Sequence, residues 1–540
     1  MEKIKNLLQG CSKEGKYRIL MVVLFFVFTV QIGFLIYMNL FASDKILNFD
    51  GANAMIHGVE IWKTKSLRVP GWHDTTQLEF DMAACIAGPL YGLTHNIFLS
   101  YGIANILFAA LYVYVILDIF KKLKKPLFHA LIGLILVFTP YCIGMIDYYS
   151  MMFFQAAFYN IRVLIPLMLL DLLITKKEEL KRPRNLVLLA VLCLFTFISS
   201  ISCGIYVPLS GLAPIFVIFV LEIVLDEGLK RFDKLHLLVM AAVLVSAALG
   251  YLATKFLGYG GMGDSMGLTN YQNMSSNLDA VLLSFFMVLD AIPSASTTVL
   301  SAAGIVYLSK AFVVICLGVV FFLHIRALFK KEEGIPIGKF IAFILLWNVF
   351  EFIFCETRYS LSNPIIENRY YLIPVIPLML LLAMEIENWS LAANHTMELL
   401  VNLGVTAFLI VLALGCDYYV VKKFDADAGY IKDIVNYVNE TIPEVDSVIL
   451  LHEPDTQGIY RLLDEDHKYT AYDPEKGRLV VYDYYDDYIK DLGESNLVLI
   501  YQWEALTDLL PEEYAADYEK IGEVDWFHVY YSESNRLPYE

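Results

Sequence analysis

The chain has 540 residues, of which 58% are hydrophobic, and a mean hydropathy of +0.57. Most of its net charge of −17 lies in residues 417–540, which hold 29 acidic and 10 basic side chains, whereas residues 1–416 are nearly neutral. The apolar share is higher than in soluble domains, and the acidic balance excludes a protein whose affinity rests on nucleic-acid phosphates.

Apolar runs of membrane-spanning length recur along residues 1–416. The first run is longer than the apolar core of a signal peptide and has no small-residue cleavage site, so we expect a retained anchor. Each run approaches the 20 or so residues that cross a bilayer. We predict about eleven transmembrane helices, at residues 19–41, 97–120, 127–145, 154–174, 186–205, 212–225, 235–257, 304–325, 340–355, 370–386 and 399–416.

The basic residues between the predicted spans mark one side of the membrane. Lysines and arginines gather in segments 121–125, 176–184, 230–234 and 326–339, whereas segments 146–156 and 258–302 contain neither. Because cytoplasmic loops carry the basic excess, we expect a cytoplasmic N-terminus in the cell (plasma) membrane and an extracytoplasmic C-terminal domain. The inside loop at residues 387–398 departs from this pattern, since it has no lysine or arginine.

Three segments outside the membrane are long enough to carry function. The first is the loop at residues 42–96, with an expected interfacial helix at 53–63, and the second is the loop at 258–303, with a candidate helix at 278–289. The third, residues 417–540, has the patterns of a small α/β domain, with helices at 430–439 and 512–520 and strands at 447–451, 497–501 and 526–531. We therefore predict a transmembrane domain over residues 1–416 and an acidic soluble domain over 417–540.

A polar cluster follows the first span. It begins with Asn-Phe-Asp-Gly-Ala-Asn at residues 48–53 and continues with His57 and Glu60. A carboxylate just beyond a membrane helix can act as general base on an acceptor, which makes Asp50 the candidate catalytic residue. The alternative is that Asp50 caps the following helix. Asp74 in the same loop and Asp147 in the next outside loop are further candidates to line the site.

Three arginines are expected at the outer rim of the membrane. Arg162 lies in the outer half of its span, and Arg358 and Arg369 lie in the outside loop before the span at 370–386. Guanidinium groups at this depth can bind a phosphate bidentately, although snorkelling to lipid headgroups is the alternative. Tyr370 and Tyr371 follow Arg369 directly and are candidates to line the same site.

Three parts of the sequence resemble the GT-C superfamily of membrane glycosyltransferases, in particular the group of protein mannosyltransferases and aminoarabinose transferases. The first is Asp50 shortly after span one, and the second is Gly-Pro-Leu-Tyr-Gly-Leu at residues 88–93, running into span two. The third, Asn-Arg-Tyr-Tyr-Leu-Ile-Pro-Val-Ile-Pro-Leu at residues 368–378, is similar to the R-Y-x-x-P-x-x-P opening of a late span in many bacterial members. The likeness in layout covers about residues 20–416.

The resemblance implies a helical bundle around a lipid-accessible cavity and a polyprenyl-phosphate-linked sugar as donor. Asp50 would match the catalytic carboxylate of inverting transfer, and Arg369, with Arg162 or Arg358, would hold the donor phosphate. The chain departs from the family in having Gly51 where mannosyltransferases have a second acidic residue. We therefore expect no cofactor and no metal site, so a divalent metal is not supported.

The resemblance thus implies a glycosyltransferase whose partners are membrane lipid, the lipid-linked donor and a cell-envelope acceptor, and not nucleic acid. One alternative is a transporter or flippase for a lipid-linked or small solute, which would be expected to show broken spans in repeated halves. No such repeat is present in the sequence. Another alternative is a non-catalytic membrane scaffold with an acidic tail that binds a partner.

Overall fold

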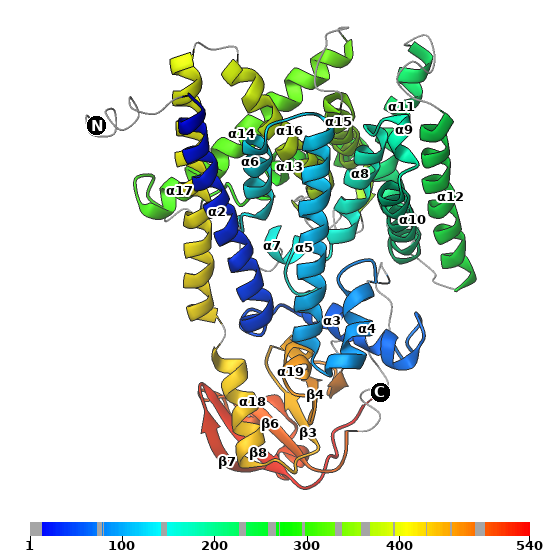
Figure 1. The fold of residues 1–540 in the computed structure, drawn as a ribbon. Coiled ribbons are helices and arrows are strands. Elements are labelled where there is room, and N and C mark those ends of the chain that lie inside the picture. Colours follow the sequence, from blue (N-terminus) through cyan, green and yellow to red (C-terminus); the bar gives the residue numbers. More distant parts are fainter. Residues whose placement is uncertain are drawn as a thin grey trace. The chain divides into compact units, whose positions relative to one another are not determined.

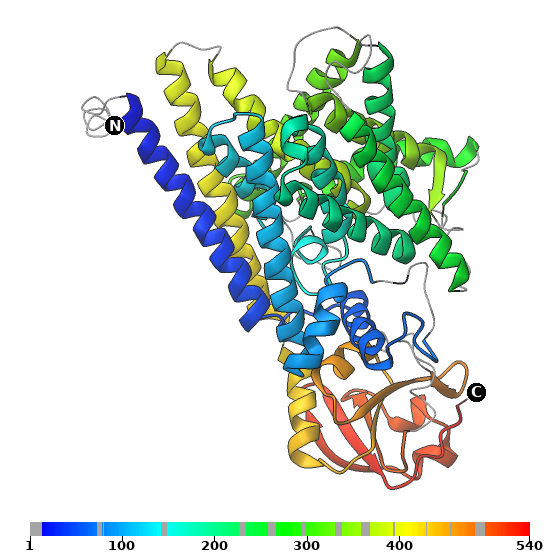
Figure 2. The same cartoon turned by 45° about the vertical axis from the view of Figure 1, so that its right-hand side comes forward.

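The computed structural model describes residues 13–72, 78, 80–141, 148–225, 234–257, 266–268, 271–293, 297–329, 337–357, 368–391, 395–427, 429–453, 456–480 and 492–539. The chain forms two compact units, shown in Figures 1 and 2. Unit 1 comprises Met1–Tyr37, Phe80–Ala83 and Asn105–Val421. Unit 2 comprises Met38–Glu79, Ala84–Ala104 and Lys422–Glu540, so most of the first outside loop belongs to the same unit as the acidic tail.

The described residues of unit 1 are helical apart from one short antiparallel pair of strands, β1 (Met266–Leu268) and β2 (Cys355–Thr357). Helices α2, α5 and α17 each run from unit 1 into residues of unit 2. The helices are α2 (Lys13–Phe41), α5 (Ile97–Lys122), α6 (Leu127–Phe138), α7 (Tyr148–Met152), α8 (Asn160–Leu173), α9 (Lys177–Leu180), α10 (Pro183–Cys203), η1 (Pro208–Leu212), α11 (Ala213–Leu225), α12 (Lys234–Phe256), α13 (Tyr271–Met287), α14 (Ala302–Phe329), α15 (Gly338–Phe354), η2 (Asn368–Tyr371), α16 (Leu372–Leu391) and α17 (His395–Asp427).

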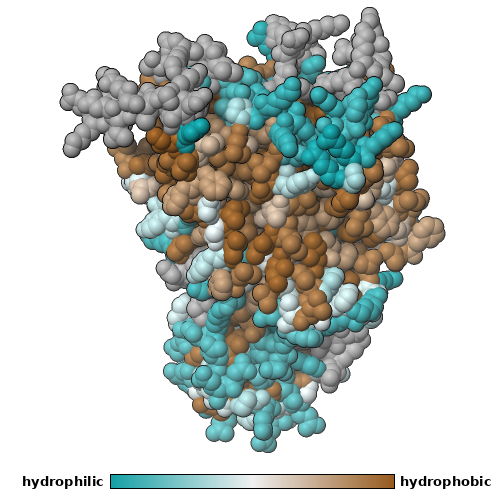
Figure 3. All heavy atoms as spheres, in the orientation of Figure 1, coloured by the Kyte–Doolittle hydropathy of each residue, from teal (hydrophilic) through white to brown (hydrophobic). Residues whose placement is uncertain are grey.

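Many helices of unit 1 present apolar side chains outward. Phe26 of α2 and Phe322 of α14 are 66% and 70% exposed, and Figure 3 shows apolar side chains gathered over this unit. Such a surface is costly in water and favourable in lipid, so the chain is a membrane protein. Among the described residues, seven helices are long and apolar enough to cross a membrane: Arg18–Phe41, Ile97–Lys122, Pro183–Cys203, Lys234–Phe256, Ala302–Arg326, Arg369–Asn388 and Met397–Lys422.

The other four predicted spans correspond to shorter helices. Helices α6, α8 and α15 have 12, 14 and 17 residues, and η1 with α11 forms the apolar helix Pro208–Val224. The count of eleven spans therefore stays a prediction. The predicted boundary at residue 416 lies inside α17, which continues to Asp427.

Helix α16 lies at the centre of unit 1, where it packs against α6, α8, α14 and α15. Its apolar stretch is 89% buried, which is the highest share among the seven long helices. Pro374 lies in its first turn, where the helix needs no backbone N–H, so the proline is compatible with a helix that starts at Leu372. At the periphery, α2 and α17 lie side by side in both views, and Gln31 donates to Asp417 at 2.6 Å.

Ion pairs join the helix ends on the side with the basic loops. Lys122 at the end of α5 lies 2.8 Å from Asp118 and 2.7 Å from Asp171 near the end of α8. Lys125 lies 2.6 Å from Glu387, near the end of α16. Glu387, in the predicted inside loop without lysine or arginine, therefore has a basic partner from another loop. The opposite ends of α8, α10, α15 and α16 carry the polar groups described below.

Unit 2 is built around a six-stranded sheet. Its strands are β3 (Ser447–Leu450), β4 (Lys468–Asp473), β5 (Arg478–Val480), β6 (Asn496–Tyr501), β7 (Glu519–Val524) and β8 (Phe527–Ser532). Their order is β5-β4-β3-β6-β8-β7, in which β3 is parallel to both β4 and β6 and the other pairs are antiparallel. The helices of the unit are α3 (Phe49–Thr64), α4 (Ala84–Thr94), α18 (Gly429–Thr441), α19 (Gln457–Leu463), α20 (Leu506–Leu509) and α21 (Glu512–Ala515).

The strands alternate between two hydrophobic cores, as the two-residue period of a strand requires. Val448 and Leu450 face the core that α18 covers, and Ile449 faces the core that contains Leu506 and Leu510. Figure 1 shows α18 lying along the sheet. Helix α3 packs against α4 and α19, which ties the segment after the first span to the sheet within this unit.

The structure confirms the predicted helix at 430–439 and the strands at 447–451, 497–501 and 526–531. The predicted helix at 512–520 is wrong beyond its first turn, because α21 ends at Ala515 and strand β7 begins at Glu519. Glutamate, alanine and lysine favour a helix locally, but pairing of β7 with β8 places Glu519 and Lys520 in the sheet edge.

Candidate functional site

Asp50 lies in the first turn of α3, two residues after the helix cap. The cap is Asn48, whose extended backbone (φ −124°, ψ 160°) precedes the helix and whose side-chain oxygen accepts a hydrogen bond from the Gly51 amide at 2.7 Å. The alternative interpretation of Asp50 as the N-cap is therefore wrong. Asp50 is exposed, and among the described residues no side chain or amide forms a hydrogen bond or ion pair with its carboxylate.

His57 lies on the same face of α3 as Asp50, because seven residues make nearly two turns. Its ring is 1% exposed and stacks on Trp72, with centroids 4.4 Å apart and planes 16° apart. Burial lowers the pKa of His57 to about 3, against an opposing interaction with the Leu78 backbone. The imidazole is therefore neutral at physiological pH and holds α3 in place by packing.

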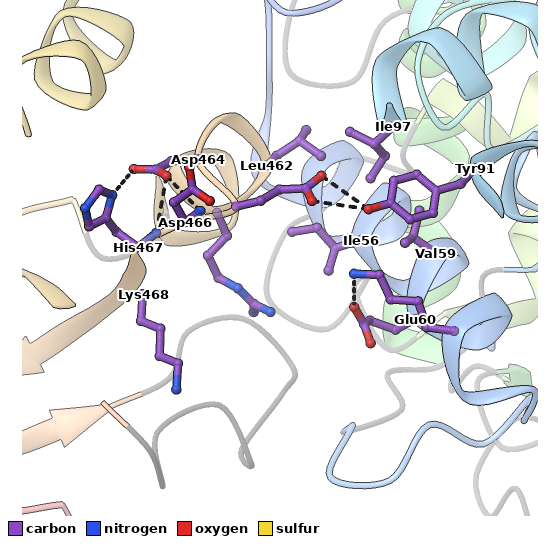
Figure 4. A pocket seen from close by; sticks show the side chains of 13 residues that line it. Ile56, Val59, Glu60, Tyr91, Ile97, Leu462, Asp464, Asp466, His467 and Lys468 are labelled. Atoms are coloured by element: carbon purple, nitrogen blue, oxygen red, sulfur yellow. Dashed lines mark hydrogen bonds and ion pairs between the residues drawn. The ribbon is translucent and has the colours of Figure 1, made fainter. Parts of the chain in front are cut away.

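Glu60 lines a pocket of about 340 Å³ within unit 2, shown in Figure 4. Glu60 and Lys63 form an ion pair at 3.1 Å, and the Tyr91 hydroxyl donates to Glu465 at 3.2 Å across the pocket. Sequence reasoning missed the residues of the tail that form one wall, since no sequence signal joins them to the first loop. The lining is Ile56, Val59, Glu60, Lys63, Tyr91, Ile97, Arg461, Leu462, Asp464, Glu465, Asp466, His467 and Lys468.

The pocket and Asp50 occupy different parts of α3. Glu60 follows Asp50 by ten residues, which corresponds to about 15 Å along the axis. At about 100° per residue, Ile56, Val59 and Lys63 point on average roughly 150° away from Asp50. Glu60 is therefore not a neighbour of Asp50, although both residues belong to one helix.

Arg162, in the first turn of α8, is buried in a two-bond ion pair with Asp81. Its Nε donates to Asp81 Oδ2 at 2.8 Å and its Nη2 donates to Oδ1 at 2.7 Å. The Ser199 hydroxyl donates to the same carboxylate at 2.7 Å, and the Ser202 hydroxyl accepts from the Asp81 amide at 3.3 Å. Arg162 and Asp81 are 1% and 0% exposed. Arg162 thus holds a carboxylate of the protein itself, and its binding of a donor phosphate stays a prediction.

Arg369 lies in the turn η2 and is half-buried, with its guanidinium 5.7 Å from the centre of the Tyr370 ring. Tyr370 packs against Tyr206 at 5.8 Å, and Tyr206 packs against Tyr159 at 6.3 Å. Arg162 lies 5.1 Å from the Tyr159 ring. These five residues, which we call the arginine–tyrosine cluster, join the starts of α8 and α16 to the segment between α10 and η1.

Tyr371 is fully buried beside the arginine–tyrosine cluster, with its ring 5.0 Å from Phe352. The structure thus brings four predicted residues (Arg162, Arg369, Tyr370 and Tyr371) to one end of the helices of unit 1. Sequence reasoning missed Tyr159 and Tyr206, because tyrosines near predicted span ends are also typical of the interface belt. The arrangement offers one half-buried guanidinium beside phenol groups. These groups donate hydrogen bonds, which suits a phosphate as ligand.

Three predicted residues, Arg358, Asp74 and Asp147, lie outside the described residues. Within the part of the chain that the structure describes, no group of three or more His, Cys, Asp or Glu side chains could hold a metal ion. Of the carboxylates in the first loop, Asp81 forms a buried ion pair with Arg162, whereas Asp50 is exposed.

No protein-family model matches the chain, and no curated protein matches it. Among solved structures, the chain is similar to the crystal structure of the Archaeoglobus fulgidus oligosaccharyltransferase in complex with zinc and sulfate. That similarity has a TM-score of 0.44 and 12% sequence identity, and it covers 87% of this chain and 67% of the other.

Proposed function

We propose that the chain is a membrane glycosyltransferase that moves a sugar from a polyprenyl-phosphate-linked donor to a cell-envelope acceptor, with Asp50 as general base. The observation that carries the proposal is the division of roles between Asn48 and Asp50. Because Asn48 caps α3, the Asp50 carboxylate stays exposed at the start of that helix, only nine residues after the end of α2 at Phe41. A general base needs this accessibility to reach an acceptor hydroxyl.

In the proposed reaction, the Asp50 carboxylate takes the proton of an acceptor hydroxyl. The acceptor oxygen forms a bond to the anomeric carbon of the donor sugar as the bond from that carbon to the phosphate oxygen breaks. The electron pair leaves with the polyprenyl phosphate, which gains negative charge. Attack from the face opposite the phosphate inverts the anomeric configuration.

Arg369 is the proposed ligand of the donor phosphate, because its guanidinium is half-buried beside the phenol of Tyr370. A guanidinium can donate two parallel hydrogen bonds to a phosphate and stabilise its growing charge. Arg358 is a second candidate ligand from the same predicted loop. We assign Arg162 a positioning role in this proposal, since its pair with Asp81 fixes the start of α8 and hence Tyr159.

The proposed location is the cell membrane, with the N-terminus in the cytoplasm and residues 417–540 outside. The four basic loop segments support this orientation, because they all fall on the side of the N-terminus. Asp50 and Arg369 belong by chain order to the opposite side. A donor with its phosphate at the outer headgroup level and an acceptor of the cell envelope are both accessible from that side.

The test compares membranes that contain the wild type, Asp50→Asn or the control Glu475→Gln, which also removes an exposed carboxylate of unit 2. Each is incubated with polyprenyl-phosphate sugars labelled in the sugar, and label is measured in the envelope fraction after removal of the lipid donor. Transfer by wild type and Glu475→Gln but not by Asp50→Asn is expected. Equal transfer by all three contradicts the role of Asp50.

A transporter is distinguished by a second measurement on the purified protein in liposomes. A transporter or flippase would move the labelled lipid-linked sugar or a small solute across the bilayer with no sugar transferred. Movement that is unchanged in Asp50→Asn, together with no transfer in any preparation, would replace the proposed enzyme with that alternative.

A further inference from the structure

In the sheet of unit 2, the two strands parallel to β3 lie on opposite sides of it, so the strand order reverses at β3. The chain passes from β3 through α19 to β4 on one side of β3, whereas β6 pairs with β3 on the other side, parallel to it. In open sheets, ligands bind outside the carboxyl ends of two strands related in this way. Strand β3 ends at Leu450 and β6 ends at Tyr501. The residues that follow these two ends are therefore the first place to look for a ligand site.

Stacked aromatic rings occupy this edge of the sheet. Tyr501 stacks on His452 at 4.1 Å and on Trp503 at 4.6 Å, with planes 28° and 15° apart. Tyr430 of α18 stacks on Trp526 at 5.8 Å, and buried Phe527 stacks on the rings of Tyr501 and Tyr430. We call His452, Tyr430, Tyr501, Trp503 and Trp526 the aromatic platform.

The two tryptophans of the aromatic platform are its exposed members. Trp503 is 70% exposed and Trp526 is 55% exposed. A large ring left in water at a loop, supported from behind by other rings, is typical of a binding surface rather than of a core. Because Tyr501 already stacks on one face of Trp503, a ligand has the opposite face of that indole available.

Carboxylates flank the rings and are held in fixed positions. Glu453 accepts hydrogen bonds from the hydroxyls of Tyr430 at 2.5 Å and Tyr501 at 3.1 Å, and Glu504 pairs with His452 at 2.5 Å. Burial and the neighbouring Glu453 raise the pKa of Tyr501 to about 12, so the phenol stays protonated and donates. Glu453 also adopts a left-handed backbone conformation (φ 50°).

We infer that the aromatic platform is a saccharide-binding site for neutral or amino sugars. A pyranose ring has an apolar C–H face that packs on an indole, and hydroxyl groups around its rim that donate to carboxylates. Residues 417–540 carry a net charge of −19, which repels phosphates, uronic acids and anionic lipid surfaces. The inference goes beyond the proposed glycosyl transfer and holds whether or not Asp50 is catalytic.

The test uses the full-length protein in detergent and calorimetric titration with maltotriose, mannotriose and chitotriose as probes. We expect at least one of the three to bind, with Trp503→Ala raising its Kd about tenfold, which is the loss expected for one stacking contact. Glu453→Gln should weaken binding about threefold, since it keeps the shape but removes the charge. Tyr539→Ala is the control, because this tyrosine is 53% exposed and borders β5 at the far edge of the sheet.

The unfolding temperature of each variant checks that the exposed substitutions leave the fold intact. The inference is overturned if none of the three saccharides binds at about 10 mM, or if Trp503→Ala binds as tightly as the wild type. Binding of a trigalacturonate or of anionic lipid vesicles in place of the neutral sugars also overturns it. Asp50→Asn should retain saccharide binding, so loss of transfer and loss of binding are separate results.

Discussion

The side chain of Asn48 accepts a hydrogen bond from the backbone amide of Gly51 at 2.7 Å, which makes Asn48 the cap of α3. This bond satisfies one of the backbone donors that a helix leaves unpaired at its start. Asp50, one residue before Gly51, is left exposed. We therefore expect substitutions of Asn48 to change stability and substitutions of Asp50 to change activity.

Asn48→Ala should cost about 1 kcal/mol of stability, because alanine cannot accept the hydrogen bond. Asn48→Asp is the matched variant, since aspartate caps helices as well as asparagine, and it should unfold at nearly the wild-type temperature. The measurement is the midpoint of thermal unfolding of the purified protein in detergent. Equal losses for alanine and aspartate would contradict the capping role.

Breaking the pair between Arg162 and Asp81 should destabilise unit 1 severely. Asp81→Asn removes the carboxylate charge that the buried Arg162 guanidinium contacts through two hydrogen bonds, and removal of one partner of such a pair costs about 3–5 kcal/mol. The double variant Asp81→Asn with Arg162→Met should recover much of that loss, because both charges of the pair are then removed. Yield and thermal midpoint in detergent report the effect.

The control for this pair is Lys520→Met, which removes one partner of the exposed pair with Glu523 at 2.6 Å. Pairs of this kind contribute about 0–1 kcal/mol, so Lys520→Met should unfold at nearly the wild-type temperature. If Asp81→Asn were as stable as Lys520→Met, the pair in unit 1 would have no structural role.

Acidification should destabilise unit 2 through His57. Its folded pKa of about 3 lies below the unfolded value of 6.5, so the unfolded chain binds more protons between these values. The contribution of the neutral His57 to the free energy of unfolding is fully present above pH 6.5. It decreases as the pH falls below that value, by about 1.4 kcal/mol per pH unit. His57→Phe keeps a ring against Trp72 and removes this slope. Parallel changes in unfolding temperature for wild type and His57→Phe from about pH 7 to 5 would contradict the prediction.

Arg369→Lys should reduce kcat/KM for the lipid-linked donor about tenfold, because lysine keeps the charge but loses the paired hydrogen bonds to a phosphate. The dependence of the transfer rate on donor concentration measures this effect. Arg536→Lys is the control, since Arg536 is an exposed arginine of unit 2 that pairs with Asp517. If Arg369→Lys has the kinetics of the wild type, Arg369 does not hold the phosphate.

The sequence predicted the positions of the long apolar helices well but not the starts of the shorter ones. Residues 154–174 form a mostly apolar run that includes Arg162 and Asp171, yet α8 begins only at Asn160. Gln155 and Ala157 before it have positive φ angles of 52° and 49°, which no helix accommodates. Hydropathy measures the preference for lipid and contains no information on such local backbone turns.

The sequence identified Arg162 and Arg369 as unusual charges but could not supply their surroundings. The partner of Arg162 is Asp81, 81 positions earlier in the chain, and only the packing of α8 against α10 brings Ser199 to the same carboxylate. The aromatic platform was missed for the same reason. Its rings come from α18, from the ends of β3 and β6 and from the turn before β8, which the topology alone brings together.

The most direct measurement is the rate at which purified protein in liposomes releases polyprenyl phosphate from a lipid-linked sugar in the presence of an envelope acceptor. Loss of a general base typically costs about 10²- to 10⁴-fold in rate. The expected result is a loss of about this size in Asp50→Asn, with the unfolding temperature nearly unchanged and with Glu475→Gln at the wild-type rate. Release by Asp50→Asn at the wild-type rate would contradict the assignment of Asp50 as the catalytic base.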